Sequence, residues 1–503
     1  MSGVGRFDWR TIAVVVIVAV AVLIGMIAIS DGRAEQDPPA EPTTKPTVVQ
    51  LDLAVWGSDA EIAAFQAVVD DYNVSSKDTN VSVSSWPDAG SMLEDIRSGA
   101  AHPDLYLLPR SELAETIAEK RNRPLLDLLE EREIPIGDDF SRDAVAAFSV
   151  NDDLQCMPYT TSPMVIYYNT DLVDFEKMEE EGLPTPDPEH TGWDLAEFRA
   201  AAEFASRPRQ GTRGVHIDPT LDGLAPFILS GGGKLFDDEA APTSLALSED
   251  DSADALRQTL EVLRDARLTL SSKQLQRRPA LEWFKRGRVA MIAGFRELTP
   301  ELRRTKGLDF DVMPMPTLGS SHTIGEVNGI CLTGGKPQRV RSSADFLTYL
   351  VSEEAVARVS QTGYLQPSNL KVALSPAFLQ PDQAPEHSMV FNNAVRTVVL
   401  PPIMEEGAEL EALVAPDIEA LLTAPVFGDL KDLLTAIDDK SRTLLDPDYE
   451  PEESDADSGA PSSDASSPGA STSGASTSGG STSEPSPFEP SPSGSATDDR
   501  KRD

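Results

Sequence analysis

The sequence predicts an α/β fold in which helices cover a parallel sheet. Runs of β-prone residues at 49–56, 80–85 and 104–108 alternate with helical patterns in the first part of the body. Such alternation is typical of parallel sheets with helical connections. Farther along, the segment 155–169 places two prolines and several hydroxyl side chains between two more β-prone stretches. We therefore expect the chain to pass there from one rigid α/β body into a second.

The helix expected after the first strand begins at a capping signal. Ser58 precedes it and Glu61 follows three residues later, which is the spacing of a capping box. Apolar side chains then recur at helical spacing, as on the buried face of a helix: Ile62, Phe65, Val69 and Tyr72. Ligands of parallel sheets bind beyond the carboxyl ends of the strands. This rule predicts ligand contacts at 56–59 after the first strand and at 109–111 after the third.

Later parts of the body continue the mixture of helices and strands. Asp194 with Glu197 forms a second capping box, and Trp193 is placed to pack on Phe198. An amphipathic helix is expected over 253–266. The remaining elements are a helix end followed by a strand over 281–295, strands over 309–316 and 326–333, and helices over 344–359 and 391–400. The α/β pattern therefore extends to about residue 446.

The N-terminal 30 residues form a membrane-directed segment. Residues 12–29 are apolar and uncharged, which is just long enough to span a bilayer. Arg6 and Arg10 precede them, so we expect a cytoplasmic N-terminus and a body outside the cell. A cleaved signal peptide and a permanent transmembrane anchor both stay open, and the length of the apolar run favours the anchor.

The segments that flank the body have the composition of linkers and tails. Residues 31–47 are rich in Pro, Thr and Glu and are expected to form an extended linker. Residues 447–503 are dominated by Ser, Gly, Pro and acidic side chains, which bury too little apolar surface to fold. We expect this C-terminal tail to be disordered.

The overall charge excludes several classes of function. The chain has a formal net charge of −40, which repels nucleic acid and anionic membrane surfaces. Signatures of serine hydrolases, zinc proteases and P-loop enzymes are absent from the sequence. The five histidines are scattered, and no His, Cys or Asp cluster has the spacing of metal ligands. We therefore expect a binding protein without a cofactor or a metal, and not an enzyme.

Five segments resemble the family 1 extracellular solute-binding proteins, the carbohydrate-type, maltose-binding-protein-like components of ABC importers. The first is the crossing QCMPYTTSPMVIYYN at 155–169. The others are VWGSDAEIAAF from Val55, PDLYLLPRSEL from Pro103, the pair FKRGRVAMIAGF and NGICLTGG, and QTGYLQPSNL from Gln361. Each motif is short and degenerate, but their order and spacing are fairly specific over 48–444.

This resemblance implies a two-lobed periplasmic-binding-protein-like fold with hinge crossings. The first lobe would comprise 48–158 and 291–334, and the second 159–290 and 335–446. Such proteins close over a small solute, here a sugar or oligosaccharide, and deliver it to permease subunits in the membrane. We expect a monomer. An alternative is a membrane-anchored ligand sensor or cell-envelope scaffold that retains the fold.

The two cysteines, Cys156 and Cys331, lie in segments that the resemblance places near the boundary between the lobes. Outside the cytoplasm they could form a disulfide. They could equally be buried thiols that act as small apolar side chains. The sequence leaves both possibilities open.

The ligand-binding residues implied by the resemblance are aromatic and polar side chains. Aromatic rings supply flat apolar surfaces for the C–H faces of sugars, and fixed polar groups bind hydroxyls. The aromatic candidates are Trp56, Tyr159, Phe295 and Tyr364. The polar candidates are Asp59, Arg110, Ser111, Thr161, Ser162, Asp222, Arg296 and Asn392.

Several positions depart from the pattern of maltodextrin binders. Leu108 and Asn392 stand where those relatives carry aromatic side chains. These changes argue against a long maltodextrin ligand. Arg110 and Arg296 would tolerate an anionic group, so a non-sugar ligand stays possible.

Overall fold

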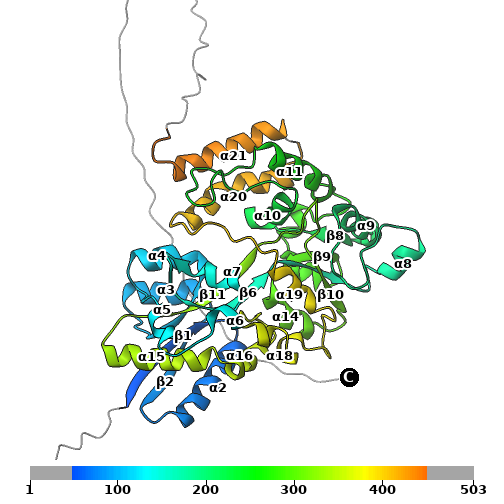
Figure 1. Cartoon of the computed structure of the whole chain (residues 1–503). Coiled ribbons are helices and arrows are strands. Elements are labelled where there is room, and N and C mark those ends of the chain that lie inside the picture. Colours follow the sequence, from blue (N-terminus) through cyan, green and yellow to red (C-terminus); the bar gives the residue numbers. More distant parts are fainter. Residues whose placement is uncertain (1–47, 427, 450–503) are drawn as a thin grey trace, which may run out of the picture. The chain divides into compact units, whose positions relative to one another are not determined.

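The structure is a computed structural model that describes residues 48–426 and 428–449 (Figure 1). The expected N-terminal anchor or signal peptide at 1–30 and the linker at 31–47 lie outside the described residues, as does the tail from residue 450. Within the described part of the chain, no helix is both long and apolar enough to cross a membrane.

The first sheet has the strand order β2-β1-β3-β11-β6. Its strands are β1 (Val49–Trp56), β2 (Thr79–Trp86), β3 (Leu105–Pro109), β6 (Met157–Pro163) and β11 (Gly325–Leu332). The first three run parallel, and β11 is antiparallel to both β3 and β6. The three parallel strands coincide within one residue with the predicted ones. The predicted parallel α/β sheet is therefore present, with one antiparallel strand, β11, inserted between β3 and the parallel strand β6 at one side.

Helices cover this first sheet and complete its core. The longer ones are α2 (Asp59–Ser75), α3 (Ala89–Ser98), α15 (Pro337–Leu350) and α16 (Glu353–Ser360). The short ones are α4 (Leu113–Ala118), α5 (Leu126–Glu130), α6 (Ile136–Asp139), α7 (Arg142–Ala147) and α17 (Leu370–Ala373). The predicted capping box of α2 is confirmed, since Ser58 and Glu61 bond reciprocally to each other's backbone. Phe65 and Val69 of α2 are buried in the core, as expected.

The second sheet has the strand order β10-β7-β9-β8. Its strands are β7 (Val165–Asn169), β8 (Arg213–His216), β9 (Val289–Gly294) and β10 (Phe310–Pro314). The central strand β7 is antiparallel to β10 and β9, whereas β8 is parallel to β9. All five residues of β7 are buried, because packed layers cover both faces of this strand.

The second sheet is covered by a larger set of helices. The longer ones are α9 (Leu195–Ala205), α10 (Leu221–Ser230), α11 (Asp250–Leu263), α20 (Gly407–Thr423) and α21 (Leu430–Leu445). The short ones are α8 (Phe175–Glu180), α12 (Ser272–Leu275), α13 (Ala280–Phe284), α14 (Thr299–Arg304), α18 (Pro376–Leu379) and α19 (Met389–Val395). Helices α20 and α21 lie beside α10 and α11 (Figure 1). The predicted capping box of α9 is confirmed.

Two predicted helices differ from the structure. The helix expected over 344–359 is divided into α15 and α16, because Ser352 adopts an extended conformation and caps α16 through its side chain. The helix expected over 391–400 is α19, which ends at Val395. Residues 396 and 397 then form a turn, and Val398 makes a parallel bridge with Thr323. A short hairpin of β4 (Ser149–Val150) and β5 (Asp153–Leu154) completes the strands of the described residues.

Consecutive strands change sheet at two neighbouring segments, at Met164 and between β10 and β11, and residues 397–399 between α19 and α20 lie beside them. Only Met164 separates β6 in the first sheet from β7 in the second. Its backbone N–H donates to the Ile324 carbonyl at 2.9 Å, and Thr323 Oγ1 donates to the Met164 carbonyl. The backbone of Thr323 also bonds to Thr397 and Val399. These crossing segments are therefore hydrogen-bonded side by side.

Sheet membership differs from the predicted division into lobes. Strands β9 and β10 fall partly or wholly within 291–334, which was expected in the first lobe, but both pair in the second sheet. Helices α15 and α16 fall within 335–446, expected in the second lobe, yet their buried side chains join the first core. A β-prone run shows that a strand forms, but its partner depends on contacts distant in sequence.

Cys156 and Cys331 form a disulfide. Both side chains are fully buried in the first core. Cys156 directly precedes β6 and Cys331 belongs to β11, its neighbour in the sheet. Of the two possibilities left open by the sequence, the structure has the bonded one.

Candidate functional site

Four predicted ligand residues are buried in structural contacts near the crossings. Tyr159 is 2% exposed, and its ring packs on Phe65 with 5.7 Å between the ring centroids. Burial raises the pKa of its phenol above the ordinary range. Thr161 Oγ1 lies 3.0 Å from Ser368 Oγ, and Ser162 Oγ accepts a hydrogen bond from the backbone N–H of Arg296. These side chains fix the crossing rather than face solvent.

Arg296 is fully buried and is held by backbone carbonyls and aromatic rings. Its Nε donates to the Gly363 carbonyl at 3.1 Å, and its Nη2 donates to the Phe378 carbonyl. The guanidinium carbon lies 4.7 Å from the centre of the Phe378 ring and 4.9 Å from that of Phe391. Burial lowers the pKa of Arg296 to about 10. This arginine therefore braces the second lobe and does not present its charge to an anionic solute.

Arg110 is engaged in a similar way in the first lobe. Its Nε donates to the Ala147 carbonyl at 3.1 Å, and its Nη1 donates to the Pro401 carbonyl at 2.6 Å. Burial lowers the pKa of Arg110 to about 10. Ser111 follows it and is exposed. The expectation that Arg110 and Arg296 would accept an anionic group has no support in these contacts.

Two further predicted residues make polar contacts in the second half of the chain. Tyr364 is partly buried, and its hydroxyl accepts a hydrogen bond from Arg304 Nη2 at 2.9 Å. Asn392 donates through Nδ2 to the Ala373 carbonyl at 2.7 Å and accepts from Gln366 Nε2 at 3.1 Å. These contacts tie local segments together.

The remaining predicted residues retain solvent-facing surface. Trp56 at the end of β1 is partly exposed, although its indole N–H donates to the Leu107 carbonyl at 3.0 Å. Asp59 is exposed in the first turn of α2, where a carboxylate interacts favourably with the helix dipole. Asp222 is exposed in the first turn of α10, and Phe295 is partly exposed directly after β9.

Five acidic side chains interact electrostatically with one another and link the exposed residues of the two lobes. Its members are Glu61, Asp222, Glu297, Glu326 and Glu411. Surrounding protein raises the pKa of Glu297 to about 8, and the charges of Glu326 and Glu61 add to this shift. Desolvation raises the pKa of Glu326, with Asp222 as the charged neighbour. Desolvation likewise raises the pKa of Asp222, with Glu411 as the charged neighbour. Like charges that interact this way lie near one another.

The five acidic residues come from both lobes. Glu61 lies on α2 and Glu326 on β11, both elements of the first lobe. Glu297 lies in the turn of 3-10 helix Arg296–Leu298 after β9, and Asp222 and Glu411 lie on α10 and α20 of the second lobe. Except for Glu61, these residues keep a substantial part of their surface exposed, so a solute can reach them, although the surrounding protein partly desolvates the carboxyls of Asp222, Glu297 and Glu326. Partly protonated carboxyls can both donate and accept hydrogen bonds.

Four members of this group were not predicted from the sequence as ligand residues. Glu61 was assigned only to the capping box, and its carboxylate does accept hydrogen bonds from the Ser58 backbone and hydroxyl. Glu297 directly follows the predicted pair Phe295 and Arg296, so its place beside these residues is a local signal. Glu326 and Glu411 carry no local signal, because their proximity depends on the fold.

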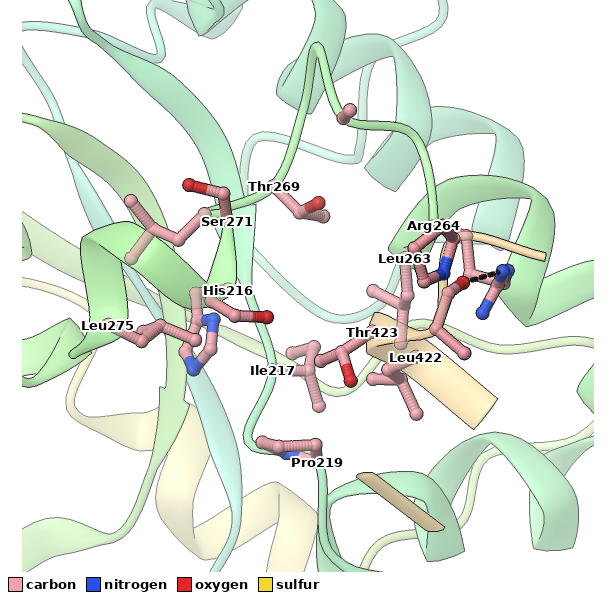
Figure 2. A pocket seen from close by; sticks show the side chains of 15 residues that line it. His216, Ile217, Pro219, Leu263, Arg264, Thr269, Ser271, Leu275, Leu422 and Thr423 are labelled. Atoms are coloured by element: carbon pink, nitrogen blue, oxygen red, sulfur yellow. Dashed lines mark hydrogen bonds between the residues drawn. The ribbon is translucent and has the colours of Figure 1, made fainter. Parts of the chain in front are cut away.

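A separate pocket lies in the second lobe (Figure 2). It has a volume of about 310 Å³ and is lined by residues near the ends of β8, α11 and α20, together with α12. His216 lies at its wall, with Nε2 3.0 Å from Asp218 Oδ1. None of the predicted ligand residues lines this pocket.

One group of side chains in the described residues has the composition of a metal site. It consists of His190 before α9, Asp311 in β10 and His387 before α19. The sequence analysis expected no metal site, because these three residues are far apart in the chain.

Two α/β lobes joined by adjacent crossing segments, with accessible polar groups drawn from both, define a two-lobed solute-binding protein. The chain belongs to the family of bacterial extracellular solute-binding proteins, whose family model matches residues 67–386. The predicted family resemblance is thereby confirmed. This family consists of binding proteins and not of enzymes.

Solved structures of sugar-binding proteins share the fold. An ABC substrate-binding protein of Listeria monocytogenes, in complex with cycloalternan, has 16% identity and a TM-score of 0.67, covering 79% of this chain and 99% of that one. The GacH receptor of Streptomyces glaucescens, solved unliganded and with acarbose, has 19% identity and a TM-score of 0.63, with coverages of 80% and 100%. The cyclic α-maltosyl-1,6-maltose binding protein of Arthrobacter globiformis has 17% identity and a TM-score of 0.64, with coverages of 79% and 99%. No curated protein sequence matches the chain.

Proposed function

We propose that this protein captures a neutral sugar or oligosaccharide between its two lobes and delivers it to the permease subunits of an ABC importer. The observation that carries the proposal is the group of accessible carboxyls contributed by both lobes. Hydroxyl groups of a sugar can donate to ionised carboxylates and accept from protonated ones. Proteins of the same fold bind cycloalternan, acarbose and a cyclic maltosyl-maltose.

The proposed contacts combine carboxyls with two aromatic surfaces. Glu297 and Glu326 would hydrogen-bond to ligand hydroxyls, and Phe295 and Trp56 would supply apolar surface for the C–H faces of a sugar ring. Asp222 would contact the ligand from the second lobe. Tyr159 and Arg296, in contrast, support these positions from within the two cores.

The distribution of the carboxyls gives a physical reason for closure. A ligand that contacts Glu61 and Glu326 in one lobe and Glu297 and Asp222 in the other gains its full set of hydrogen bonds only when the lobes approach. Such a ligand favours the closed conformation by its greater affinity for that state. The moving bodies would be the two sheets with their packed helices, and the crossings at 163–165 and 314–325, together with the adjacent segment 397–400, would form the hinge.

The proposed location in the cell depends on residues 1–30. If it stays attached as a transmembrane anchor, the body is held at the outer surface of the membrane, close to a permease. We also expect sugar acids to be rejected, because they would bring a further negative charge close to Glu297 and Glu326.

The test is a thermal-shift and calorimetric screen of the purified full chain. The panel contains neutral linear and cyclic oligosaccharides, monosaccharides, amino sugars, polyols and sugar acids. We expect a neutral oligosaccharide to raise the Tm by several degrees when it is present well above its Kd, and sugar acids to have no effect.

Matched variants locate the site. Glu297→Gln combined with Glu326→Gln should abolish the shift, whereas Glu239→Gln, an exposed carboxyl on a loop of the second lobe, should leave it unchanged. The proposal fails if no neutral sugar stabilises a well-folded sample, or if stabilisation is the same in the double variant. Stabilisation by amino sugars alone would show that the acidic group selects a cationic solute.

A further inference from the structure

Two histidines and an aspartate from distant parts of the chain meet at the edge of the second sheet. One potential ligand atom from each of His190, Asp311 and His387 lies within 4.8 Å of the other two. His190 and Asp311 are 6% and 5% exposed. The His387 side chain is 30% exposed, which gives the group access to solvent.

The hydrogen bonds of this group determine which ring nitrogens are available. His190 Nδ1 lies 3.1 Å from the Val312 carbonyl oxygen, and His387 Nδ1 lies 2.5 Å from Asp311 Oδ2. A carbonyl oxygen can only accept, so the neutral His190 ring carries its proton on Nδ1 and its lone pair on Nε2. Histidines that bind metals characteristically donate their other N–H to a backbone carbonyl in this way. The proton between His387 Nδ1 and Asp311 Oδ2 would be released when these two atoms bind a metal ion.

The position of Asp311 is fixed by further hydrogen bonds. Its Oδ1 accepts from the backbone N–H of Val312 at 2.9 Å and of His387 at 3.0 Å. A buried carboxylate beside two imidazoles supplies negative charge that offsets the charge of a cation.

The two imidazoles are stacked, with 3.7 Å between their centroids and 29° between their planes. The stacked rings hold one nitrogen of each histidine within 4.8 Å of the other and of a carboxylate oxygen of Asp311.

We propose that His190, Asp311 and His387 form a binding site for a divalent transition-metal ion of the zinc type. Imidazole nitrogens with one carboxylate suit Zn²⁺ and its neighbours Co²⁺, Ni²⁺ and Cu²⁺, whereas Mg²⁺ and Ca²⁺ prefer sites built from oxygen alone. Three protein groups would leave a further coordination position to water.

The site would have a structural effect on the second lobe. Strand β10 is the edge strand of its sheet, and the loop before α9 covers that edge through the side chains of His190 and Trp193, which bond to the carbonyls of Val312 and Pro314. An ion bound at this point would join the loop, the edge strand and the start of α19. It would thereby stabilise the lobe without taking part in solute binding.

Direct metal titration of the purified full chain tests the proposal. The sample carries no polyhistidine tag and is treated with a chelator and then dialysed. Zn²⁺ is titrated against a chromophoric chelator as competitor, and Co²⁺ is added to a second sample for its visible absorption bands. We expect one equivalent of Zn²⁺ to bind, a Co²⁺ spectrum typical of mixed nitrogen and oxygen ligands, and an increase in Tm with Zn²⁺.

Variants separate this site from adventitious binding to the acidic surface. His387→Ala should remove the saturable equivalent and the Tm increase, whereas His102→Ala, an exposed histidine of the first lobe, should retain both. Asp311→Asn, with the same size but no charge, serves as a second variant if His387→Ala unfolds, and far-UV circular dichroism checks the fold. Absence of saturable binding, or binding that persists in His387→Ala and Asp311→Asn, would overturn the proposal.

Discussion

The protonation state of Glu297 sets what this side chain can offer a ligand. With its pKa raised to about 8, the group is mostly a neutral acid at pH 7, and a neutral acid donates one hydrogen bond. The raised pKa also affects folding. In the unfolded chain this carboxyl ionises near its ordinary pKa of 4.5, whereas in the folded protein it stays protonated to a higher pH. Its contribution to stability is therefore complete below pH 4.5 and is lost as the pH rises through about 8.

Replacement of this carboxyl by an amide should remove that pH dependence. We expect Glu297→Gln to lose less stability than the wild type between about pH 4.5 and about pH 8, because the amide does not ionise. The measurement is the free energy of unfolding by denaturant across this range, with Glu239→Gln as control. Parallel pH profiles for wild type and Glu297→Gln would contradict the assignment of the raised pKa.

For single residues of the site, the sequence predicted the position along the chain but not the direction of the side chain. The motifs placed Tyr159, Ser162 and Arg296 at the crossings. The structure has Tyr159 and Ser162 in β6, which leads into the first crossing, whereas Arg296 follows β9 inside the second lobe. Their side-chain directions were not encoded in the motifs. Arg296 turns between two phenylalanines into the core, and Tyr159 packs against α2. Position along the chain follows from local patterns, but burial of a given side chain depends on the packing of distant elements.

At the scale of elements, the sequence predicted the features that depend on contacts between residues close in the chain. The capping boxes at Ser58 and Asp194 fix helix starts through contacts three residues apart, and both were predicted. Strand partners are different. Strand β10 joins β7, which lies far earlier in the chain, and nothing in its five residues specifies that pairing. The division into lobes could therefore not be predicted from β-prone runs alone.

The disulfide that joins Cys156, just before β6, to Cys331 in β11 should contribute strongly to the stability of the first lobe. It links residues separated by 175 positions, so it restricts a long loop in the unfolded chain. We expect the double variant Cys156→Ala with Cys331→Ala to lose roughly 2–5 kcal/mol of unfolding free energy. Chemical denaturation followed by circular dichroism measures this loss.

Reduced wild type is the matched control for that variant, because it loses the covalent link but keeps both sulfur atoms. Since both cysteines are fully buried, the reductant must be present during unfolding. Reduced wild type should unfold at a midpoint close to that of the double variant. If oxidised wild type and the double variant share one midpoint, the disulfide makes no contribution.

At the scale of the whole molecule, the position of the disulfide separates rigid from moving parts. It lies inside the first lobe, beside the strands that lead into the crossings, and Met164 alone separates the two sheets at the first crossing. The crossing segments bond to one another through their backbones. Motion between the lobes is therefore expected to occur by rotation at these few residues, while each sheet keeps its hydrogen bonds.

Distance measurements between the lobes test this motion. Ala118 ends α4 in the first lobe, and Asp432 lies on α21 in the second; both are exposed. Because the native cysteines are bonded to each other, probes on Ala118→Cys and Asp432→Cys would label only these positions. We expect a sugar that raises the Tm to shorten the distance between the probes. A control pair within the second lobe, Asp251→Cys and Asp432→Cys, should keep its distance.

The same labelled protein distinguishes closure from simple binding. If the carboxyls of the two lobes must meet around the ligand, Glu297→Gln with Glu326→Gln should prevent the shortening, because the ligand would no longer interact better with the closed state than with the open one. A ligand that binds with normal affinity but leaves the distance unchanged would show that its contacts come from one lobe. In that case, binding would carry no conformational signal that a permease could recognise, and delivery to an importer would lose its physical basis.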